Sequence, residues 1–117
     1  MQKILITLNA SPYGSERTLS GLRLASALLS TDPKPQLHLF MLSDAIVTAL
    51  SGQVAATGES LGEMLQNLLE GGADLRVCRT CATARGINEE RLIAGVKIGT
   101  MPELATLTLE ADKVISF

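Results

Sequence analysis

The sequence predicts an α/β sandwich built on a mainly parallel β-sheet. Short apolar runs alternate along the chain with segments of helical spacing, an alternation typical of parallel strands joined by crossover helices. At 117 residues, of which 46% are hydrophobic and 19% charged, the chain is long and apolar enough to bury one substantial core. We therefore expect a single domain over residues 1–117.

The first strand and the first helix are predicted close to the start of the chain. Residues 4–8 form a short apolar run, which is typical of a buried parallel strand. Residues 9–15 are rich in turn-forming side chains, and Ser15 can cap a helix whose leucines and alanines recur with helical spacing as far as residue 29. Pro33 stops that helix.

The next segment predicts a second strand, a short helix and a loop. Residues 37–42 are the strand, and either Ser43 or Asp44 can cap a short helix that runs through residue 50. Residues 51–58 are rich in glycine, alanine and threonine, so we expect a loop there.

The middle of the chain predicts a helix, the third strand and a helical turn. Amphipathic spacing predicts the helix over residues 60–69, and a pair of glycines ends it. Residues 74–78 form the third strand. Residues 81–85 can form one helical turn, which Gly86 stops.

The last part of the chain predicts two further strands and two helices. Asn88 can cap a helix through residue 93, and residues 96–98 can form a short strand. A second helix follows Thr100, and residues 113–117 form the final strand.

Composition argues against two classes of partner. The net charge is -2, tryptophan is absent and aromatic residues make up 3% of the chain, so neither a basic stripe nor a stacking platform for nucleic acid is expected. The apolar run at residues 4–8 is too short for a signal peptide or a membrane span. We expect no membrane contact and a cytoplasmic location, where thiols stay reduced.

The two cysteines, Cys78 and Cys81, are the most informative residues. They form a single C-x-x-C at the end of a predicted strand, with Arg76, Arg79 and Arg85 close in sequence. A nearby positive charge stabilises a thiolate, which is the nucleophilic form of the side chain. Strand alternation places Arg76 and Cys78 on the same face of the sheet. The motif therefore predicts sulfur chemistry, with the three arginines lowering the pKa of the thiol and binding the resulting anion.

The sequence allows three interpretations of Cys81. It can resolve a disulfide with Cys78, share or receive a sulfane sulfur, or pack against the sheet. A structural zinc site needs four ligands, and besides the two cysteines the chain has only His38, far along the sequence. We expect neither a metal nor a cofactor, and we expect His38 to be a partly exposed or interface residue.

Two other strand ends are expected to meet the cysteines. The carboxyl ends of parallel strands lie at one edge of a sheet, where ligands gather. Asn9, Ser11 and Tyr13 follow the first strand, and Ser43 and Asp44 follow the second. We expect these loops to line a pocket beside the thiols, with Asp44 acting as a helix cap rather than as a base.

The chain resembles the DsrE/DsrF-like sulfur-relay family, and most closely its small YchN-like members. The likeness spans essentially the whole chain. The segments that carry it are residues 10–16, residues 40–45, the Cys78–Cys81 motif with the following Arg-Gly-Ile at residues 85–87, and residues 111–117.

The resemblance implies a three-layer α/β/α sandwich with about five parallel strands, assembled as trimers or hexamers. In the sulfur-relay members, the cysteine eight residues before the glycine of an Arg-Gly pair carries a persulfide. Cys78 stands in that relation to Gly86, so the resemblance assigns the persulfide to Cys78. Cys81 matches the second cysteine of the YchN-like members.

Three functions follow from these observations. The first is a homo-oligomeric persulfide carrier, in which Cys78 accepts a sulfane sulfur from a donor protein and passes it to an acceptor protein, shielded by the loop at residues 51–58. The second is a dithiol redox protein that uses Cys78 and Cys81. The third is a non-enzymatic oligomeric module that binds a small ligand. The high apolar share also favours a homo-oligomer.

Overall fold

A single parallel sheet of five strands forms the centre of the molecule. The computed structural model describes residues 1–117. The strands are β1 (Lys3–Leu8), β2 (Gln36–Met41), β3 (Asp74–Cys78), β4 (Lys97–Gly99) and β5 (Lys113–Ser116). They lie in the order β4-β3-β2-β1-β5, and every neighbouring pair is parallel. The predicted parallel sheet is confirmed.

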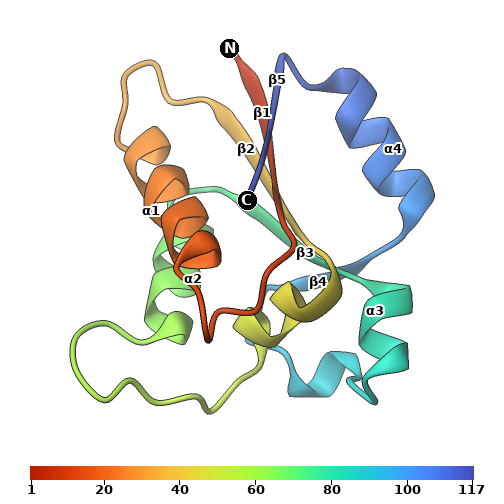
Figure 1. Ribbon diagram of the computed structural model, residues 1–117. Helices are drawn as coiled ribbons and strands as arrows, with labels where there is room; N and C mark the ends of the chain where they lie inside the picture. Colours follow the sequence, from red (N-terminus) through yellow and green to blue (C-terminus); the bar gives the residue numbers. More distant parts are fainter.

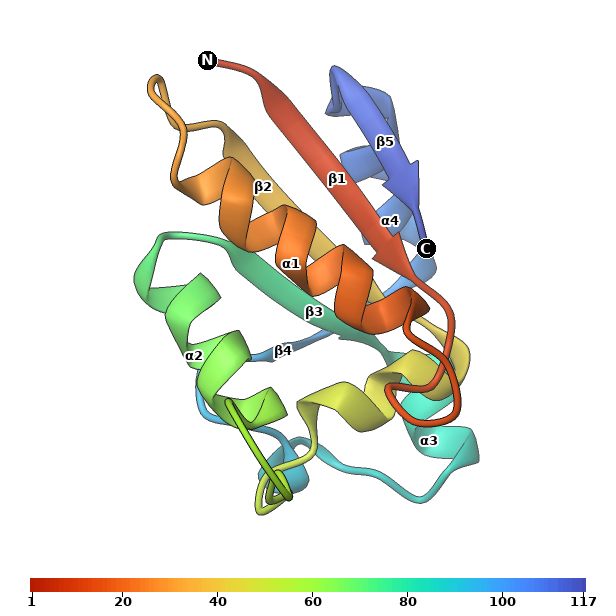
Figure 2. The ribbon, with the colours of Figure 1, turned by 60° about the vertical axis from the view of Figure 1, so that its left-hand side comes forward.

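Helices cover both faces of this sheet. They are α1 (Arg17–Leu29), α2 (Leu61–Glu70), α3 (Arg79–Ala84) and α4 (Met101–Glu110), with the 3₁₀ helices η1 (Ser43–Ala49) and η2 (Glu89–Arg91). Helices α1 and α2 lie on one face, whereas α4 lies on the other (Figure 1). Figure 2 shows the same three layers, with α1 and α2 in front of the sheet and α4 behind it. The α/β sandwich is therefore confirmed.

The face under α1 and α2 is aliphatic from one end of the sheet to the other. Ile6 pairs with Leu39 of β2, and Leu39 pairs with Leu75 of β3, all buried in one cluster of 21 residues. Each such side chain stabilises the fold by roughly 1.5–3 kcal/mol when fully buried. Gly21 brings α1 close to β1, because a Cβ there would lie 2.5 Å from Leu8 Cδ2.

The opposite face, under α4, mixes polar and apolar side chains. Leu5 pairs with His38, and His38 pairs with Asp74, so these three side chains share one row across the sheet. The apolar part of this face is a small buried cluster of Leu5, Phe40 and Cys78. Side chains of α4 pack against that cluster, but none of the residues of α4 is fully buried. Helix α4 therefore buries less apolar side chain against the sheet than α1 and α2 do.

Side-chain hydrogen bonds show where the helices begin and whether the predicted capping residues are correct. Ser60 accepts a hydrogen bond from the Glu63 N–H at 3.1 Å, and Thr100 accepts one from the Glu103 N–H at 3.3 Å, so α2 and α4 begin with side-chain caps. The Ser15 hydroxyl accepts a hydrogen bond from the Arg17 N–H at 3.4 Å, as a cap would, but α1 begins one residue later than this prediction places it.

At the start of α1, Glu16 occupies the capping position without a side-chain hydrogen bond. Burial of Leu22 and Ala25 also stabilises α1. The helix predicted from Asn88 to residue 93 is also shorter than expected, since only Glu89–Arg91 forms a single 3₁₀ turn.

Two buried threonines offer a matched test of hydrogen bonding in the core. Thr18 and Thr48 are both completely buried. The Thr18 hydroxyl donates to the Ala10 carbonyl at 2.5 Å, whereas the Thr48 hydroxyl has no partner. Burying an unpaired hydroxyl costs free energy that a paired hydroxyl does not cost.

We expect Thr48→Val to raise the free energy of unfolding by about 1 kcal/mol, since it removes an unpaired polar group without changing the shape of the side chain. Thr18→Val is the matched control and is expected to lower it by about 1–3 kcal/mol, because the Ala10 carbonyl loses its donor. Urea unfolding of both variants measures the two changes. Equal destabilisation by both substitutions would contradict this account.

Candidate thiol site

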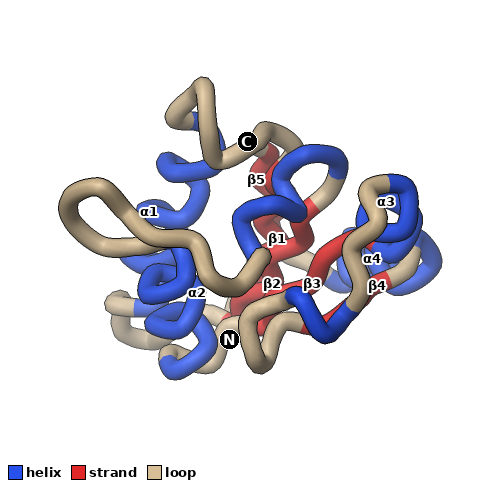
Figure 3. The backbone as a smooth tube through the Cα atoms, turned by 90° about the horizontal axis from the view of Figure 1, so that it is seen from below, coloured by secondary structure: helices blue, strands red, loops and turns tan.

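The two cysteines lie together at the carboxyl end of β3. Cys78 is the last residue of β3 and the capping residue of α3, and Cys81 lies in the first turn of that helix. The Cys81 side chain packs against the buried cluster that contains Cys78. Figure 3 looks on to this edge of the sheet, with α3 beside the ends of the strands. The C-x-x-C therefore places two thiols side by side.

Cys78 is the buried member of the pair. Its side chain is 1% exposed and packs with Leu5 and Phe40 on the face that α4 covers. Burial raises the pKa of the Cys78 thiol above its ordinary value, and the neighbouring Cys81 thiol adds to the rise, whereas the backbone N–H groups of Thr80 and Cys81 oppose it. The expectation that arginines lower the pKa of this thiol is therefore wrong for the single chain.

Cys81 occupies a different environment. Its side chain is partly exposed, and its sulfur accepts a hydrogen bond from the Ser43 backbone N–H at 3.1 Å. Ser43 has a φ of 52°, the only non-glycine residue in the left-handed region. No sequence pattern predicts this donor, because serine is not a residue that favours left-handed backbone.

Arg85 connects the cysteine segment to η1. Its side chain donates to Asp44 Oδ1 from Nε at 3.0 Å and from Nη2 at 2.9 Å. It also donates to the Cys81 carbonyl oxygen at 3.1 Å. The prediction that Asp44 caps a helix is wrong, since Leu42 precedes η1 as its capping residue and Asp44 lies in the first turn. The Asp44 carboxylate instead pairs with the guanidinium.

The other two arginines are arranged differently. Arg76 shares the face of Cys78, as alternation predicts, but its guanidinium pairs with Asp74 at 2.8 Å and with Glu103 of α4. Arg79 is exposed and makes no ion pair. Of the three arginines expected around the thiols, Arg85 alone hydrogen-bonds to a cysteine residue.

Asp74 is the centre of a polar network on the α4 face. Besides Arg76, it accepts a hydrogen bond from His38 Nδ1 at 2.9 Å, and Lys97 Nζ lies 3.4 Å from its other oxygen. Burial by itself would raise the pKa of Asp74, but the His38 hydrogen bond and the charges of Arg76, His38 and Lys97 outweigh it and lower that pKa. Through Arg76 and Glu103, this network ties β3 to α4.

Only one of the two loops expected beside the thiols makes hydrogen bonds to the cysteine segment. Ser43 and Asp44 reach the thiol segment, but the loop after β1 makes its hydrogen bonds elsewhere. Asn9 bonds to the Phe117 carbonyl, Ser11 accepts from the Tyr13 N–H, and the Tyr13 hydroxyl donates to Gln53. These three residues make no hydrogen bond to either cysteine.

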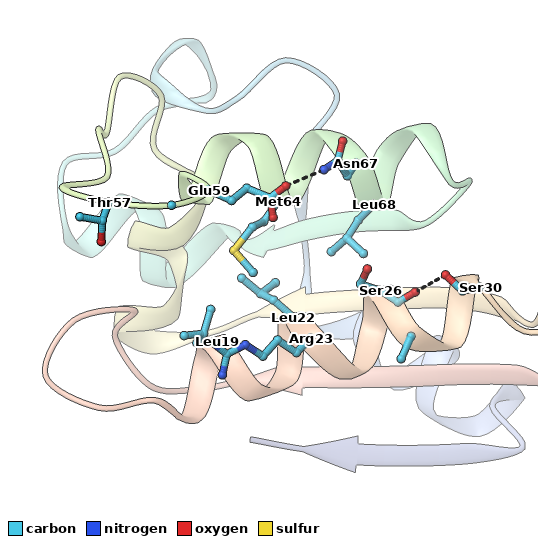
Figure 4. A pocket seen from close by; sticks show the side chains of 12 residues that line it. Leu19, Leu22, Arg23, Ser26, Ser30, Thr57, Glu59, Met64, Asn67 and Leu68 are labelled. Atoms are coloured by element: carbon cyan, nitrogen blue, oxygen red, sulfur yellow. Dashed lines mark hydrogen bonds between the residues drawn. The ribbon is translucent and has the colours of Figure 1, made fainter.

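The largest described cavity lies away from the cysteines. It has a volume of about 590 Å³ and is formed between α1 and α2 with the loop before α2 (Figure 4). Leu22, Met64 and Leu68 give it an apolar floor, and Arg23 and Glu59 stand at its polar rim. No sequence pattern predicts this cavity, because two amphipathic helices do not by themselves indicate how closely they pack.

Two further properties bear on the kind of site. The structure contains no group of three or more histidine, cysteine, aspartate or glutamate side chains placed to hold a metal ion. None of the helices combines the length with the apolar character that crossing a bilayer requires.

Comparisons with known proteins agree on one family. A model of the DsrE/DsrF-like family matches residues 2–117. The protein YchN of Escherichia coli is 45% identical over 117 residues, all of both chains, and protein MJ0989 of Methanocaldococcus jannaschii is 36% identical over 98% of this chain and 99% of its own. The crystal structure of YchN superposes over all of both chains with a TM-score of 0.94. MTH1491 of Methanobacterium thermoautotrophicum, at 12% identity, shares the fold over all of both chains with a TM-score of 0.83.

We expect Asp74→Asn to lower the free energy of unfolding near neutral pH by about 1–3 kcal/mol, because charge-assisted hydrogen bonds are lost. Since the pKa of Asp74 is lowered in the folded chain, its contribution is present above the unfolded carboxyl pKa and is lost as pH falls through the folded value. The difference between wild type and variant should therefore shrink between about pH 6 and about pH 3. Urea unfolding at both pH values measures it.

Glu110→Gln is the control for this titration, because Glu110 is exposed and makes no ion pair. A difference between wild type and Asp74→Asn that stays constant with pH would contradict the assignment of acid-sensitive stability to Asp74.

Proposed function

Since this chain belongs to the DsrE/DsrF-like family, we propose that it is a sulfur carrier that holds a persulfide on Cys78. One observation supports the proposal above all others. Two free thiols lie side by side at the carboxyl end of β3, one buried and one open to solvent, with a backbone N–H directed at the open sulfur. Ligands of parallel sheets gather at that edge.

The buried position of Cys78 suits the storage of a reactive sulfur. A persulfide forms when a thiolate attacks the outer sulfur of a donor R–S–SH, so that a new S–S bond forms as the donor's S–S bond breaks and R–S⁻ leaves with the electron pair. Cys78 is only 1% exposed, and the side chains of α4 that pack over it shield its sulfur from water and from other thiols. Release then requires an acceptor thiol of a partner protein.

A dithiol redox protein is the second candidate. The adjacency of the two thiols supports it, since Cys78 could attack a substrate disulfide and Cys81 could resolve the mixed disulfide that results. The raised pKa of Cys78 slows attack by this thiol in both candidates, so it does not distinguish the redox protein from the carrier.

A binding module is the third candidate, and the cavity between α1 and α2 supports it. The apolar floor and charged rim suit a small amphipathic ligand, and the cavity shares no residue with the cysteine pair. In this case the cysteines would take no part in function.

We further propose that the carrier works as a homo-oligomer, a trimer or a hexamer, in the cytoplasm, where both thiols stay reduced. Its partners are a sulfur donor protein and an acceptor protein, and neither nucleic acid nor a membrane is among them. The outer side of α4 supports the oligomer: Leu109 is 87% exposed and Met101 48%, and Val114 of the edge strand β5 is 47% exposed. Such a patch is unfavourable in water unless another chain covers it.

Leu109→Glu is expected to lower the molar mass in solution, because it places a charge in the proposed contact between copies. Sedimentation velocity at several concentrations measures the mass. Val54→Glu is the matched control, since Val54 is equally apolar and 90% exposed, in the loop before α2 rather than on α4. A single-chain mass for the wild type, or an unchanged mass for Leu109→Glu, would contradict an interface on α4.

The sulfur-carrier proposal is tested by intact mass after reduced protein is incubated with glutathione persulfide. The expected result is a gain of about 32 Da that reductant removes and that Cys78→Ser no longer retains at long times. A loss of about 2 Da that needs both cysteines would instead identify the dithiol protein. No change in mass would leave the binding module as the function.

A further inference from the structure

We propose that Cys81 is the sulfur that first accepts the sulfane sulfur from a donor, and that it passes this sulfur inward to Cys78. The inference rests on the proposed sulfur carriage and assigns a role to each cysteine within it. It follows from the unequal surroundings of the two sulfurs.

Access separates the two cysteines. Cys78 is 1% exposed and is enclosed by Leu5 and Phe40, with Leu104 and Leu107 of α4 packed on the same cluster. A donor protein could reach this sulfur only after α4 moved. Cys81 is partly exposed and packs against the same cluster, so it is the more accessible of the two cysteines and lies next to Cys78.

A directed hydrogen bond also separates them. The Ser43 N–H donates to Cys81 Sγ at 3.1 Å, and a donor at this position stabilises negative charge on the sulfur, as a thiolate or as a persulfide anion. The left-handed backbone of Ser43 is strained and persists only where the surrounding structure fixes it. Here the Leu42 N–H bonds to the Leu8 carbonyl, and the Ala45 N–H bonds to the Leu42 carbonyl, so the turn is held on both sides.

Arg85 holds donor and acceptor in this arrangement. Its guanidinium bonds both to Asp44, the residue after Ser43, and to the carbonyl of Cys81 itself. The guanidinium pairs with the Asp44 carboxylate and makes no hydrogen bond to either sulfur, so we assign Arg85 a positioning role. It fixes η1 against α3 and thereby keeps the Ser43 N–H on the sulfur.

The transfer takes place in two balanced steps. In the first, the Cys81 thiolate attacks the outer sulfur of R–S–SH, which forms Cys81–S–SH and releases R–S⁻. In the second, Cys78 attacks the outer sulfur of Cys81–S–SH, the Cys81–sulfur bond breaks, and the proton of the Cys78 thiol moves to the departing Cys81 sulfur. The products are Cys78–S–SH and Cys81–SH, and no external oxidant or reductant is used.

The chain offers a direct way to follow the sulfur. Arg79 lies between the cysteines, so trypsin releases Cys78 in a peptide of residues 77–79 and Cys81 in a peptide of residues 80–85. Wild-type protein is mixed with glutathione persulfide, quenched with an alkylating reagent after increasing times, digested without reductant and analysed by mass spectrometry. The extra sulfur is expected on residues 80–85 at the earliest times and on residues 77–79 later.

Two variants complete the test, with circular dichroism to confirm folding. Cys81→Ser is expected to slow the loading of Cys78 by about tenfold or more, because the solvent-facing nucleophile is gone. Cys78→Ser is expected to load Cys81 at the wild-type initial rate but to lose the sulfur quickly when free thiol is added. If Cys81→Ser does not fold, the wild-type time course decides the order.

The inference is overturned if the first sulfur detected in the wild type lies on residues 77–79, or if folded Cys81→Ser loads Cys78 as fast as the wild type. Either result would leave sulfur carriage by Cys78 in place. Absence of extra sulfur from both peptides of the wild type would overturn sulfur carriage as well, so the two failures are distinguishable.

Discussion

Burial of the aliphatic face of the sheet beneath α1 and α2 is the constraint on which the rest of the molecule depends. Eight of the 21 residues of the main core are strand residues of that face, and the helices and connecting segments supply the rest; a large aliphatic side chain contributes roughly 1.5–3 kcal/mol when fully buried. Because one face provides most of the stabilisation, the other face is free to carry groups that stabilise less. His38, Asp74, Arg76 and Cys78 all lie on that second face.

The lighter packing of α4 follows from the same division. The polar row beneath this helix offers it few apolar partners, so α4 is held by Leu104 and Leu107 over the small cluster and by the ion pair from Arg76 to Glu103. The small cluster also contains Cys78. The helix that covers the proposed storage site is therefore α4, which has no fully buried residue. Helix α4 thus links the proposed contact between copies, through its outer side, to the proposed storage site beneath it.

The parts of the structure that could be predicted from the sequence are those fixed by local chemistry. The third strand was expected over residues 74–78 and is found there, because alternation ends where the C-x-x-C begins a helix. Ser15 was expected to cap α1, and its hydroxyl does accept the Arg17 N–H, although the helix begins one residue later than predicted. The ion pair of Arg76 with Glu103, 27 residues away in sequence, depends on how α4 lies against β3. No local pattern encodes that position. The donor at Ser43 depends on a left-handed residue that sequence preferences do not indicate.

The two cysteines show how far one motif can place identical groups in unlike environments. They are three residues apart, Cys78 at the end of β3 and Cys81 in the first turn of α3, yet desolvation dominates at Cys78 and a backbone N–H is directed at Cys81. A persulfide carrier has opposite requirements at loading and at storage: an exposed, charged sulfur reacts quickly, and an enclosed, neutral one survives. One cysteine cannot meet both requirements without a moving lid. In the proposed relay, two cysteines at this spacing meet the requirements of loading and storage without a movement of α4, because the sulfur passes from one to the other.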